Sequence, residues 1–310
     1  MRAAILREHG AVPEIAEHPE PAGPDVVDLV VAGMNPVDIR IATGTFGLER
    51  HAPPYVAGKE GVGRRPDGSL VYFEYSVKPF GAFAERTRLE PGDGYTLPDG
   101  LDPGLAVCLG VSGLAAWLGL GWRGRLAEGE TVLVLGASGV VGQIAVQAAK
   151  LLGAGRVVAA ARNPEWLERT RFLGADATVS LAGDGDHTAA LTAAAGDGGF
   201  DVVLDPLWGA PAVAALGAMA SFGRIVALGQ AAGAEATIPS AAVRGKPVDI
   251  LGYTNYTAGE ERKAAAFAAL AEHAAAGRIS VEIERYGLDD VPQVWERQAT
   301  SPNAKQVIVF

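Results

Sequence analysis

Cysteine is almost missing from this chain, since Cys108 is the only one among 310 residues. A single cysteine excludes an internal disulfide, and it also excludes a structural zinc lobe built from several cysteines. The fold therefore depends on packing alone. With 49% apolar residues, a chain of this length can bury a sizeable core, and we expect two domains.

The chain also lacks an excess of positive charge, a long apolar run and a secretory leader. Its net charge is −10, without any block of Lys and Arg, so we expect no nucleic acid partner. We find no apolar run of the roughly 18–20 residues that a bilayer requires, and the start MRAAILREHG has no apolar centre typical of a signal peptide. We therefore expect a cytoplasmic protein with no membrane partner and a small-molecule substrate.

From residue 131 onward, short β-branched runs alternate with Ala-rich helical segments, as in βαβ units around a parallel sheet. The predicted strands cover residues 131–135, 156–161, 177–180, 201–205, 224–229 and 248–253. The predicted helices cover about 140–152, 164–173, 186–195 and 210–220. Six strands with such crossovers predict an α/β fold with a doubly wound parallel sheet.

The first 110 residues have a different character, because Pro and Gly are dense and the apolar runs are short. They predict an irregular, mainly β domain. An Ala-rich helix over 258–276 leads to two strand-like pieces, ISVEIERY and KQVIVF, which are too short for a third domain. We expect these pieces to return to the first domain.

The segment VLVLGASGVVGQ, residues 132–143, carries the clearest chemical signal. A strand precedes its glycine turn and a helix follows it. Small residues let the backbone approach a pyrophosphate, the N–H groups at the helix start point at it, and Gly142 permits close contact between helix and strand. The alternative is a tight turn without a ligand. The residues expected to bind a cofactor here are Gly136, Ser138, Gly139, Val140, Val141 and Gly142.

The end of the second predicted strand distinguishes two dinucleotides. An Asp or Glu about 20 residues past the loop binds the ribose of NAD, whereas an Arg accommodates the 2′-phosphate of NADP. Counting from Gly142 reaches Arg162, and no acid stands there, since Glu165 follows Pro164 in the first turn of a helix. We therefore expect NADPH, with Arg162 at its 2′-phosphate. The alternative is an Arg that only contacts solvent.

Six segments, taken in chain order, carry a family resemblance: MNPVDIRIATGTFG, GKEGVG, FGAFAE, GVSGLAAW, VLVLGASGVVGQIAVQAAKLLGA and FGRIVALGQAAG. Together they resemble the medium-chain dehydrogenase/reductase superfamily, and within it the zinc-free quinone oxidoreductase branch. The resemblance implies a GroES-like catalytic domain of residues 1–112 and 252–310, a Rossmann cofactor domain of residues 113–251, and a substrate cleft between them. It also implies a homodimer through VDILGY and hydride transfer from NADPH to quinones or enones.

Zinc-dependent members of the superfamily hold their catalytic metal with a Cys, a His and a second Cys. The resemblance places Asn35, Lys59 and Cys108 at these positions, so that only the last is a metal ligand by type. Val37 replaces the hydroxyl that starts the proton relay of the zinc enzymes. We therefore expect no metal site, and we expect Cys108 to be a small buried residue rather than a nucleophile.

Without a metal, reduction of an enone still needs a partner for the developing negative charge and a source for the proton. Related enoyl reductases use a tyrosine in a GxYG-like segment, where this chain has Phe46. Water, Lys59 or another tyrosine remain as proton sources. Lys59 is the catalytic candidate, because a desolvated ammonium supplies both charge and proton. Its alternative role is a structural ion pair with Glu60 or Asp38.

The remaining site residues follow from the resemblance and from the sheet. Asn35, a second catalytic candidate, would line the nicotinamide ribose, unless it only forms the turn before Pro36. Ser112 would lie near the cofactor phosphates or this ribose, unless it only packs. Gly229 and Gln230 end a predicted strand at the sheet edge where ligands bind, although Gln230 could equally contact only solvent.

These residues predict an NADPH-dependent, zinc-independent reductase of a quinone or an α,β-unsaturated carbonyl. Two alternatives stay open. A dedicated biosynthetic enoyl or carbonyl reductase would turn over one substrate well and simple quinones poorly. A non-catalytic redox sensor would keep the NADPH-binding residues and lack the chemistry.

Overall fold

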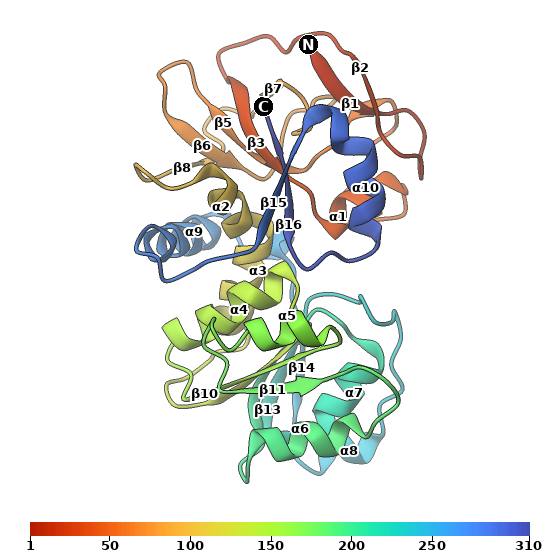
Figure 1. The fold of residues 1–310 in the computed structure, drawn as a ribbon, viewed down its shortest axis with the longest axis vertical. Coiled ribbons are helices and arrows are strands. Elements are labelled where there is room, and N and C mark those ends of the chain that lie inside the picture. Colours follow the sequence, from red (N-terminus) through yellow and green to blue (C-terminus); the bar gives the residue numbers. More distant parts are fainter. The chain divides into compact units, whose positions relative to one another are not determined.

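The computed structural model describes Met1 to Phe310 and divides the chain into two compact units (Figure 1). Unit 1 comprises Met1–Val111, Phe267–Gly277 and Val281–Phe310. Unit 2 comprises Ser112–Ala266 and Arg278–Ser280. The predicted boundary after residue 251 falls inside unit 2, and the catalytic and cofactor roles of the two parts stay predictions.

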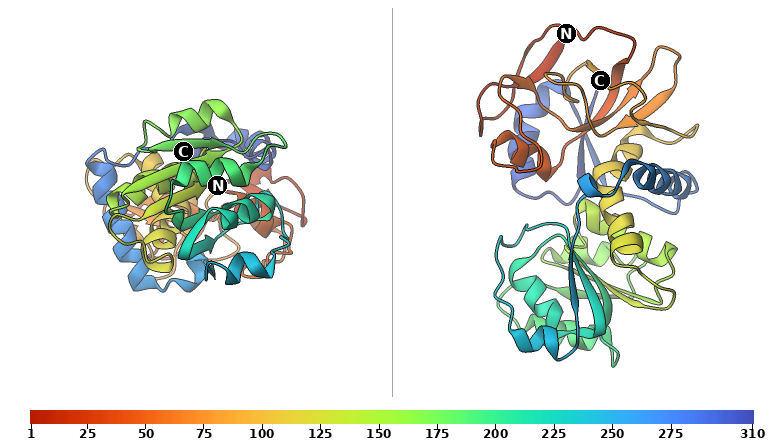
Figure 2. Two further views of the ribbon diagram at one scale, coloured as in Figure 1. Left: turned by 90° about the horizontal axis from the view of Figure 1, so that it is seen from below. Right: turned by 180° about the vertical axis from the view of Figure 1, so that it is seen from behind.

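Unit 2 is built on a six-stranded parallel sheet of order β11-β10-β9-β12-β13-β14. Its strands are β9 (Thr131–Leu135), β10 (Arg156–Ala161), β11 (Ala177–Ser180), β12 (Phe200–Asp205), β13 (Met219–Ala227) and β14 (Asp249–Gly252). Helices α4 (Val140–Leu151) and α5 (Pro164–Arg169) cover one face, and α6 (His187–Ala195), α7 (Gly209–Gly217) and α8 (Ser240–Arg244) cover the other (Figure 2). The predicted doubly wound sheet is confirmed.

The central strands of this sheet are buried on both faces, which explains their uninterrupted apolar sequence. Val132 to Leu135 and Val157 to Ala160 have no exposed surface. A parallel sheet covered by helices on both sides requires such strands, whereas a half-exposed strand alternates apolar and polar residues. The carboxyl ends of β9, β10, β12 and β13 consequently meet at one edge of the sheet.

Unit 1 is mainly β, as predicted. It holds a three-stranded sheet, β2-β1-β4, and a seven-stranded sheet, β15-β16-β3-β5-β6-β8, in which β7 also pairs with β3. These strands are β1 (Arg2–Leu6), β2 (Glu14–Glu17), β3 (Val26–Gly33), β4 (Tyr55–Val56), β5 (Glu60–Arg64), β6 (Leu70–Phe73), β7 (Arg86–Arg88), β8 (Tyr95–Thr96), β15 (Ile283–Gly287) and β16 (Lys305–Val309). The C-terminal strands join this sheet because β16 pairs antiparallel with β3.

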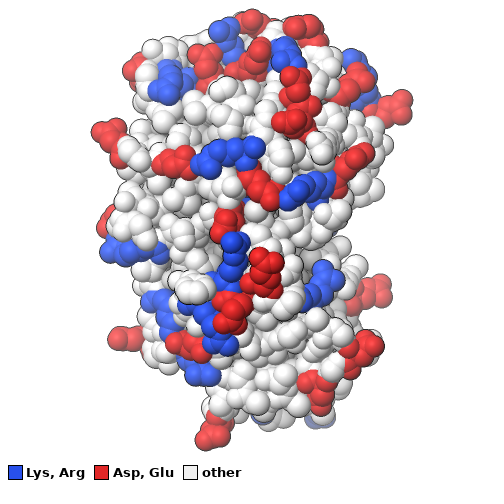
Figure 3. All heavy atoms as spheres, viewed as in Figure 1, with Lys and Arg blue, Asp and Glu red and all other residues white.

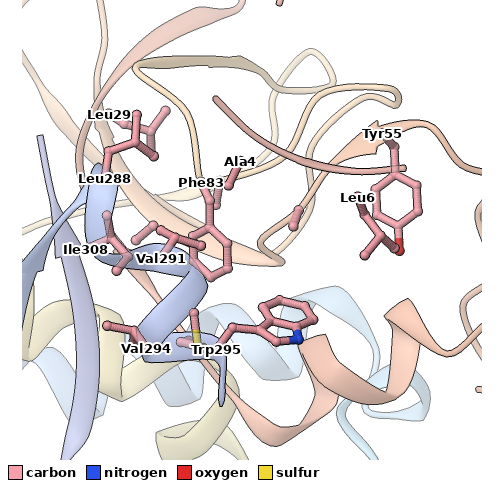
Figure 4. Packing of buried hydrophobic residues seen from close by; sticks show 14 of the residues in the cluster. Ala4, Leu6, Leu29, Tyr55, Phe83, Leu288, Val291, Val294, Trp295 and Ile308 are labelled. Atoms are coloured by element: carbon pink, nitrogen blue, oxygen red, sulfur yellow. The ribbon is translucent and has the colours of Figure 1, made fainter. Parts of the chain in front are cut away.

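The core of unit 1 fixes the strands that carry the site. Helix α10 (Val291–Ala299) places Val291, Val294 and Trp295 on one face by the spacing of i, i+3 and i+4, and all three are buried. Figure 4 shows them beside Phe83 and Ile308. Further helices are α1 (Pro36–Ala42), α2 (Pro103–Cys108) and α9 (Glu260–Ala275), the last of which passes from unit 2 into unit 1.

Residues Pro103–Arg123 form one helical stretch that corrects an expectation from the sequence. Its 21 residues and mean hydropathy of 1.8 meet the length and composition needed to cross a membrane, whereas we predicted that no segment would. However, 72% of the most apolar 18 residues of this stretch is buried inside the protein, as in the core helix of a soluble protein. The stretch comprises α2, α3 (Leu114–Leu118) and two π-helical turns, Leu109–Gly113 and Gly119–Arg123.

Charged side chains of both signs are interspersed on the face drawn in Figure 3. This face shows no extended stripe of Lys and Arg, the surface feature that nucleic acid binding requires. The predicted absence of a nucleic acid partner was based on the net charge, and it stays a prediction.

Candidate functional site

The glycine turn of unit 2 has the geometry that the sequence predicts. β9 ends at Leu135 and α4 begins after Gly139, which occupies the N-cap. A Cβ on Gly142 would lie 2.4 Å from the carbonyl oxygen of Gly136, so helix and turn touch at this glycine. A Cβ on Gly139 would meet that same oxygen at 3.5 Å, an ordinary contact, and this side of the turn stays open to a ligand.

The turn is rigid because its neighbours hold its backbone. The N–H of Ala137 donates to the carbonyl oxygen of Ala160 in β10 (3.1 Å), and the Gln143 amide donates to the carbonyl oxygen of Ser138 (3.0 Å). The first N–H groups of an α-helix have no partner within the helix. The N–H groups of Val140 and Val141 lie at the start of α4 beside the turn, where an anionic group can accept hydrogen bonds from them.

Arg162 follows β10 directly and is exposed. Its guanidinium makes no hydrogen bond or ion pair in this structure, whereas the next residue, Asn163, caps α5 by accepting the N–H of Trp166 (3.2 Å). Glu165 lies in the first turn of α5, as predicted. The end of β10 therefore offers a phosphate one unengaged positive charge and no competing acid at the strand end.

The other predicted cofactor residues of unit 2 lie in two further places. Gly229 follows β13, and a Cβ there would lie 2.4 Å from the carbonyl oxygen of Pro206, so the loops after β12 and β13 touch. Gln230 is exposed beside it. Ser112 is buried in the π-helical turn of Leu109–Gly113. Their roles at a cofactor stay predictions.

Asp205 at the end of β12 is a buried acid that the sequence analysis missed. Its Oδ1 accepts the N–H groups of Leu207 and Trp208, both at 2.8 Å, and fixes the loop into α7. Its Oδ2 is buried without a hydrogen-bond partner, and burial raises the pKa of this carboxyl. The sequence did offer one signal for this residue, since an acid ends the apolar predicted strand DVVLD.

Unit 1 contains a buried polar network around Glu60, which stands opposite Gly33 where β3 ends and β5 begins. The ammonium of Lys305 donates to Glu60 Oε1 (2.7 Å) and to Asn35 Oδ1 (2.6 Å). Asn35 Nδ2 in turn donates to Glu60 Oε1 (2.8 Å). The amide of Asn35 therefore orients an ion pair, and no sequence motif indicated Lys305 as its partner.

The second oxygen of Glu60 is equally occupied. Oε2 accepts the Tyr72 hydroxyl (2.7 Å) and the N–H of Val111 (2.9 Å). Gly110 makes both contacts possible, because its non-helical backbone (ψ −113°) interrupts the helix, and a Cβ there would lie 1.9 Å from the Tyr72 hydroxyl oxygen. Burial raises the pKa of Tyr72 well above its usual value. Glu60 is thus a fully bonded carboxylate.

Lys59, next to this network, has different partners from those predicted. Its ammonium bonds Glu49 Oε2 (2.8 Å) and lies 3.7 Å from Glu74 Oε1 and 3.8 Å from the centre of the Tyr75 ring. The ion pair that was the alternative role of Lys59 is present, but its partners were predicted wrongly: they are Glu49 and Glu74, whereas Glu60 pairs with Lys305. Its side chain is 2% exposed.

Asp38 supports the backbone of this region rather than the ammonium. Its Oδ1 accepts the N–H of Lys59 (2.9 Å) and its Oδ2 accepts the N–H of Asn35 (2.8 Å). Burial outweighs these bonds and raises the pKa of Asp38 to about 6. Asp38 thereby ties the start of α1 to the segment that carries Lys59.

Cys108 and Phe46 complete the positions singled out from the sequence. The Cys108 thiol is buried and donates to the carbonyl oxygen of Gly104 (3.2 Å), and burial raises its pKa to about 12. The ring of Phe46 lies 5.2 Å from the guanidinium carbon of Arg40. The structure contains no group of three or more His, Cys, Asp or Glu side chains able to hold a metal ion.

Known proteins are similar to this chain in sequence and in fold. The family described as zinc-binding dehydrogenase matches residues 140–271. One chain of the phenolphthiocerol/phthiocerol polyketide synthase from Mycobacterium tuberculosis is 34% identical over 223 residues, which are 68% of this chain and 10% of that protein. A mycobacterial quinone oxidoreductase of 22% identity covers both chains completely with a TM-score of 0.86.

Two relatives are more informative. The quinone oxidoreductase from Thermus thermophilus, solved alone and with NADPH, is 29% identical with a TM-score of 0.81, and the match covers both chains completely. Mouse quinone oxidoreductase-like protein 2 is 30% identical over 263 residues, which are 81% of this chain and 74% of that protein. The chain therefore belongs to the medium-chain dehydrogenase/reductase superfamily of oxidoreductases, in its quinone oxidoreductase branch.

Proposed function

We propose that this chain is a reductase that uses NADPH to transfer hydride to a quinone or an α,β-unsaturated carbonyl without a zinc ion. The observation that carries the proposal is the chemistry at the three positions of the zinc ligands. Zinc needs neutral imidazole, carboxylate or thiolate donors. Asn35 is bonded to Glu60 and Lys305, and Lys59 presents an ammonium.

The third position supports the same conclusion. The Cys108 thiol is buried and donates to the carbonyl oxygen of Gly104, and one thiol without a second ligand does not make a zinc site. The matched zinc-binding dehydrogenase family covers residues 140–271, which contain none of these three positions. The match therefore supports the cofactor unit and does not argue for a metal.

The glycine turn and Arg162 fit NADPH. The open side of Gly139 and the N–H groups of Val140 and Val141 would hold the pyrophosphate, and Arg162 would hold the 2′-phosphate. When bound, NADPH supplies a hydride and its electron pair. The Thermus relative, which was solved with NADPH, supports this choice. We assign Ser112, Gly229 and Gln230 to the same cofactor.

Lys59 is the proposed source of charge and proton. Hydride addition to the β-carbon of an enone moves an electron pair onto the carbonyl oxygen, and a buried ammonium stabilises that charge more than it would in water. Lys59 then protonates the enolate. Asn35 has a positioning role, because its side-chain amide is already bonded to Glu60 and Lys305.

A biosynthetic enoyl reductase is the second candidate, and the likeness to the polyketide synthase favours it. Phe46 argues against it, because the tyrosine hydroxyl of related enoyl reductases is missing. The two candidates differ in the ratio of kcat/KM for an enoyl thioester and for a simple quinone. A ratio well above one favours the thioester reductase.

We also propose a cytoplasmic homodimer that pairs through β14. This strand lies at the edge of the unit 2 sheet, and its Ile250 is 37% exposed. Exposed strand edges offer unpaired N–H and C=O groups to a second chain. Ile250→Lys should give a monomer in sedimentation velocity, whereas a wild-type protein that sediments as a monomer contradicts the dimer.

The proposed function is tested by stopped-flow oxidation of NADPH and NADH by chelator-treated protein, with a panel of quinones, enones and aldehydes. Fast oxidation of NADPH with a quinone or an enone is the expected result. Tight NADPH binding without oxidation by any acceptor contradicts the reductase and favours a redox sensor.

A further inference from the structure

We propose that Glu49 and His51 form a proton relay that carries a proton from solvent to Lys59 after each turnover. This inference rests on the proposed function, in which Lys59 protonates the reduced product. It assigns a role to two residues that the sequence motifs did not indicate. Both lie in the irregular segment between α1 and β4.

The three side chains form one hydrogen-bonded chain. Nε2 of His51 lies 2.8 Å from Glu49 Oε1, and Glu49 Oε2 lies 2.8 Å from Nζ of Lys59. The two carboxylate oxygens therefore contact His51 and Lys59 respectively, and a proton accepted from His51 reaches Lys59 once the carboxyl group turns about its Cγ–Cδ bond. Both separations are those of strong, charge-assisted hydrogen bonds.

The solvent exposure of the three side chains rises from Lys59 to His51, as a relay from solvent to Lys59 requires. The side chain of Lys59 is 2% exposed, that of Glu49 is 13% exposed and that of His51 is 21% exposed. A buried amine that has lost its proton cannot exchange it directly with bulk water. His51 reaches solvent, and histidine is the side chain best suited to exchange protons near neutral pH.

The surroundings keep the proton on this route. Tyr55 stacks edge-on to His51 at 5.5 Å, but its buried hydroxyl has no hydrogen-bond partner, and burial raises its pKa to about 12. The other titratable or charged groups around these three side chains are Asp38, Glu74, Tyr75 and Lys78. None of them is bonded to His51, so the carboxylate of Glu49 is its proton acceptor.

Protons and electrons balance over the cycle. Lys59 gives one N–H proton to the α-carbon of the enolate and becomes a neutral amine. Protonated His51 gives its Nε2 proton to Glu49 Oε1, and the carboxyl group turns about its Cγ–Cδ bond so that the protonated oxygen faces Lys59. This O–H then gives its proton to the Lys59 nitrogen, and His51 takes a proton from a hydronium ion of the solvent. Each turnover consumes one proton from solvent, and the electron pair comes from the hydride.

The nature of the acceptor provides an internal control. Protonation of an enolate at carbon is slow and needs a positioned acid, whereas a hydroquinone oxyanion takes its proton rapidly from water. Loss of the relay should therefore slow repeated turnover of an enone and spare turnover of a quinone. It should also spare the first hydride transfer, because Lys59 is already protonated at that stage.

The test compares His51→Ala with His18→Ala. His18 is a matched control, because it is also partly exposed in unit 1 and packs edge-on against an aromatic ring, Phe80 at 5.6 Å, yet its Nδ1 contacts only the carbonyl oxygen of Pro19. Single-turnover NADPH oxidation measures hydride transfer. Steady-state enone reduction, with and without added imidazole, measures the return of the proton.

We expect His51→Ala to slow steady-state enone turnover about 10-fold or more, to leave single-turnover hydride transfer unchanged, and to regain activity with imidazole. His18→Ala should behave like wild type. Unchanged enone turnover in His51→Ala, or a loss that imidazole does not restore, overturns the relay alone. A wild-type protein that transfers no hydride overturns the proposed function and the relay with it.

Discussion

The glycine turn of unit 2 allows stability and cofactor binding to be separated by adding one methyl group at two neighbouring positions. On Gly142 the methyl would lie 2.4 Å from the carbonyl oxygen of Gly136 and 2.5 Å from Cα of Ala137, which are backbone atoms that cannot rotate away. On Gly139 the nearest of these atoms would be 3.5 Å away. Both substitutions add the same methyl group, but only the methyl at Gly142 clashes with backbone atoms.

The expected magnitudes follow from these contacts. In a helix, Ala is normally more stable than Gly by about 0.5–1 kcal/mol, whereas overpacking costs about 1–3 kcal/mol. Because the clash at Gly142 is with backbone, we expect Gly142→Ala to lower the free energy of unfolding by about 1–2 kcal/mol. At Gly139 the entropic gain offsets the poorer N-cap, and the change should stay within about 0.5 kcal/mol.

Cofactor binding should respond to the substitution that leaves stability unchanged. The methyl of Gly139→Ala occupies the open side of the turn, so the Kd for NADPH should rise about 10-fold or more, which corresponds to about 1.4 kcal/mol. Urea unfolding measures the stability, and titration of NADPH fluorescence measures the Kd. Gly198→Ala is the control, because a Cβ there has nothing within 4 Å. The reasoning is refuted if Gly142→Ala is as stable as this control, or if Gly139→Ala binds NADPH like wild type.

Three further outcomes are expected. Arg162→Gln should weaken NADPH binding about 10- to 100-fold and leave NADH binding unchanged; an unchanged ratio of the two Kd values would remove Arg162 from the 2′-phosphate. The pKa of Asp38 is about 6 in the folded state against an ordinary 3.8, so protonated Asp38 stabilises the fold below about pH 4, and this contribution is lost as the pH rises through about 6. Over that pH range the free energy of unfolding of wild type, measured with urea, should fall by about 3 kcal/mol more than that of Asp38→Asn. Parallel pH profiles of the two proteins would contradict this. Glu60→Gln leaves the ammonium of Lys305 buried without its counter-ion and should cost about 3–5 kcal/mol, part of which the added change Lys305→Met should restore; a double variant no more stable than the single one would argue against the ion pair.

Local patterns were sufficient to predict the fold of unit 2. β9, β10 and β11 have the predicted bounds, because each is a short apolar run bounded by turn residues or by the start of a helix. The role of Gly142 could also be predicted, since a glycine after such a turn leaves room for the backbone of the preceding strand. Both signals come from residues close together in sequence.

The contacts of unit 1 could not be predicted in the same way. Glu60 and Lys305 are 245 residues apart, and only the pairing of β16 with β3 brings the lysine to the start of β5. The partner of Lys59 was predicted wrongly for a related reason. Glu49 lies in a segment without regular structure, so neither period nor spacing indicated which way its carboxylate points.

The predicted absence of a membrane-length segment failed because Gly and Ser interrupt the apolar residues of Pro103–Arg123. As an apolar run this stretch is broken, but its helical segments follow one another directly and are mostly apolar. At its kink Gly110 lies against the buried side chain of Tyr72, a tertiary contact that no local pattern contains.

The central claim is that hydride transfer from NADPH proceeds in this chain without zinc. The most direct measurement is the rate of enone and quinone reduction by NADPH carrying deuterium at both C4 positions, set against the zinc content of the same chelator-treated samples. The account predicts deuterium in the reduced enone and a rate that is independent of zinc content for both acceptors. A rate that rises in proportion to bound zinc, or a reduced enone without the label, would contradict it.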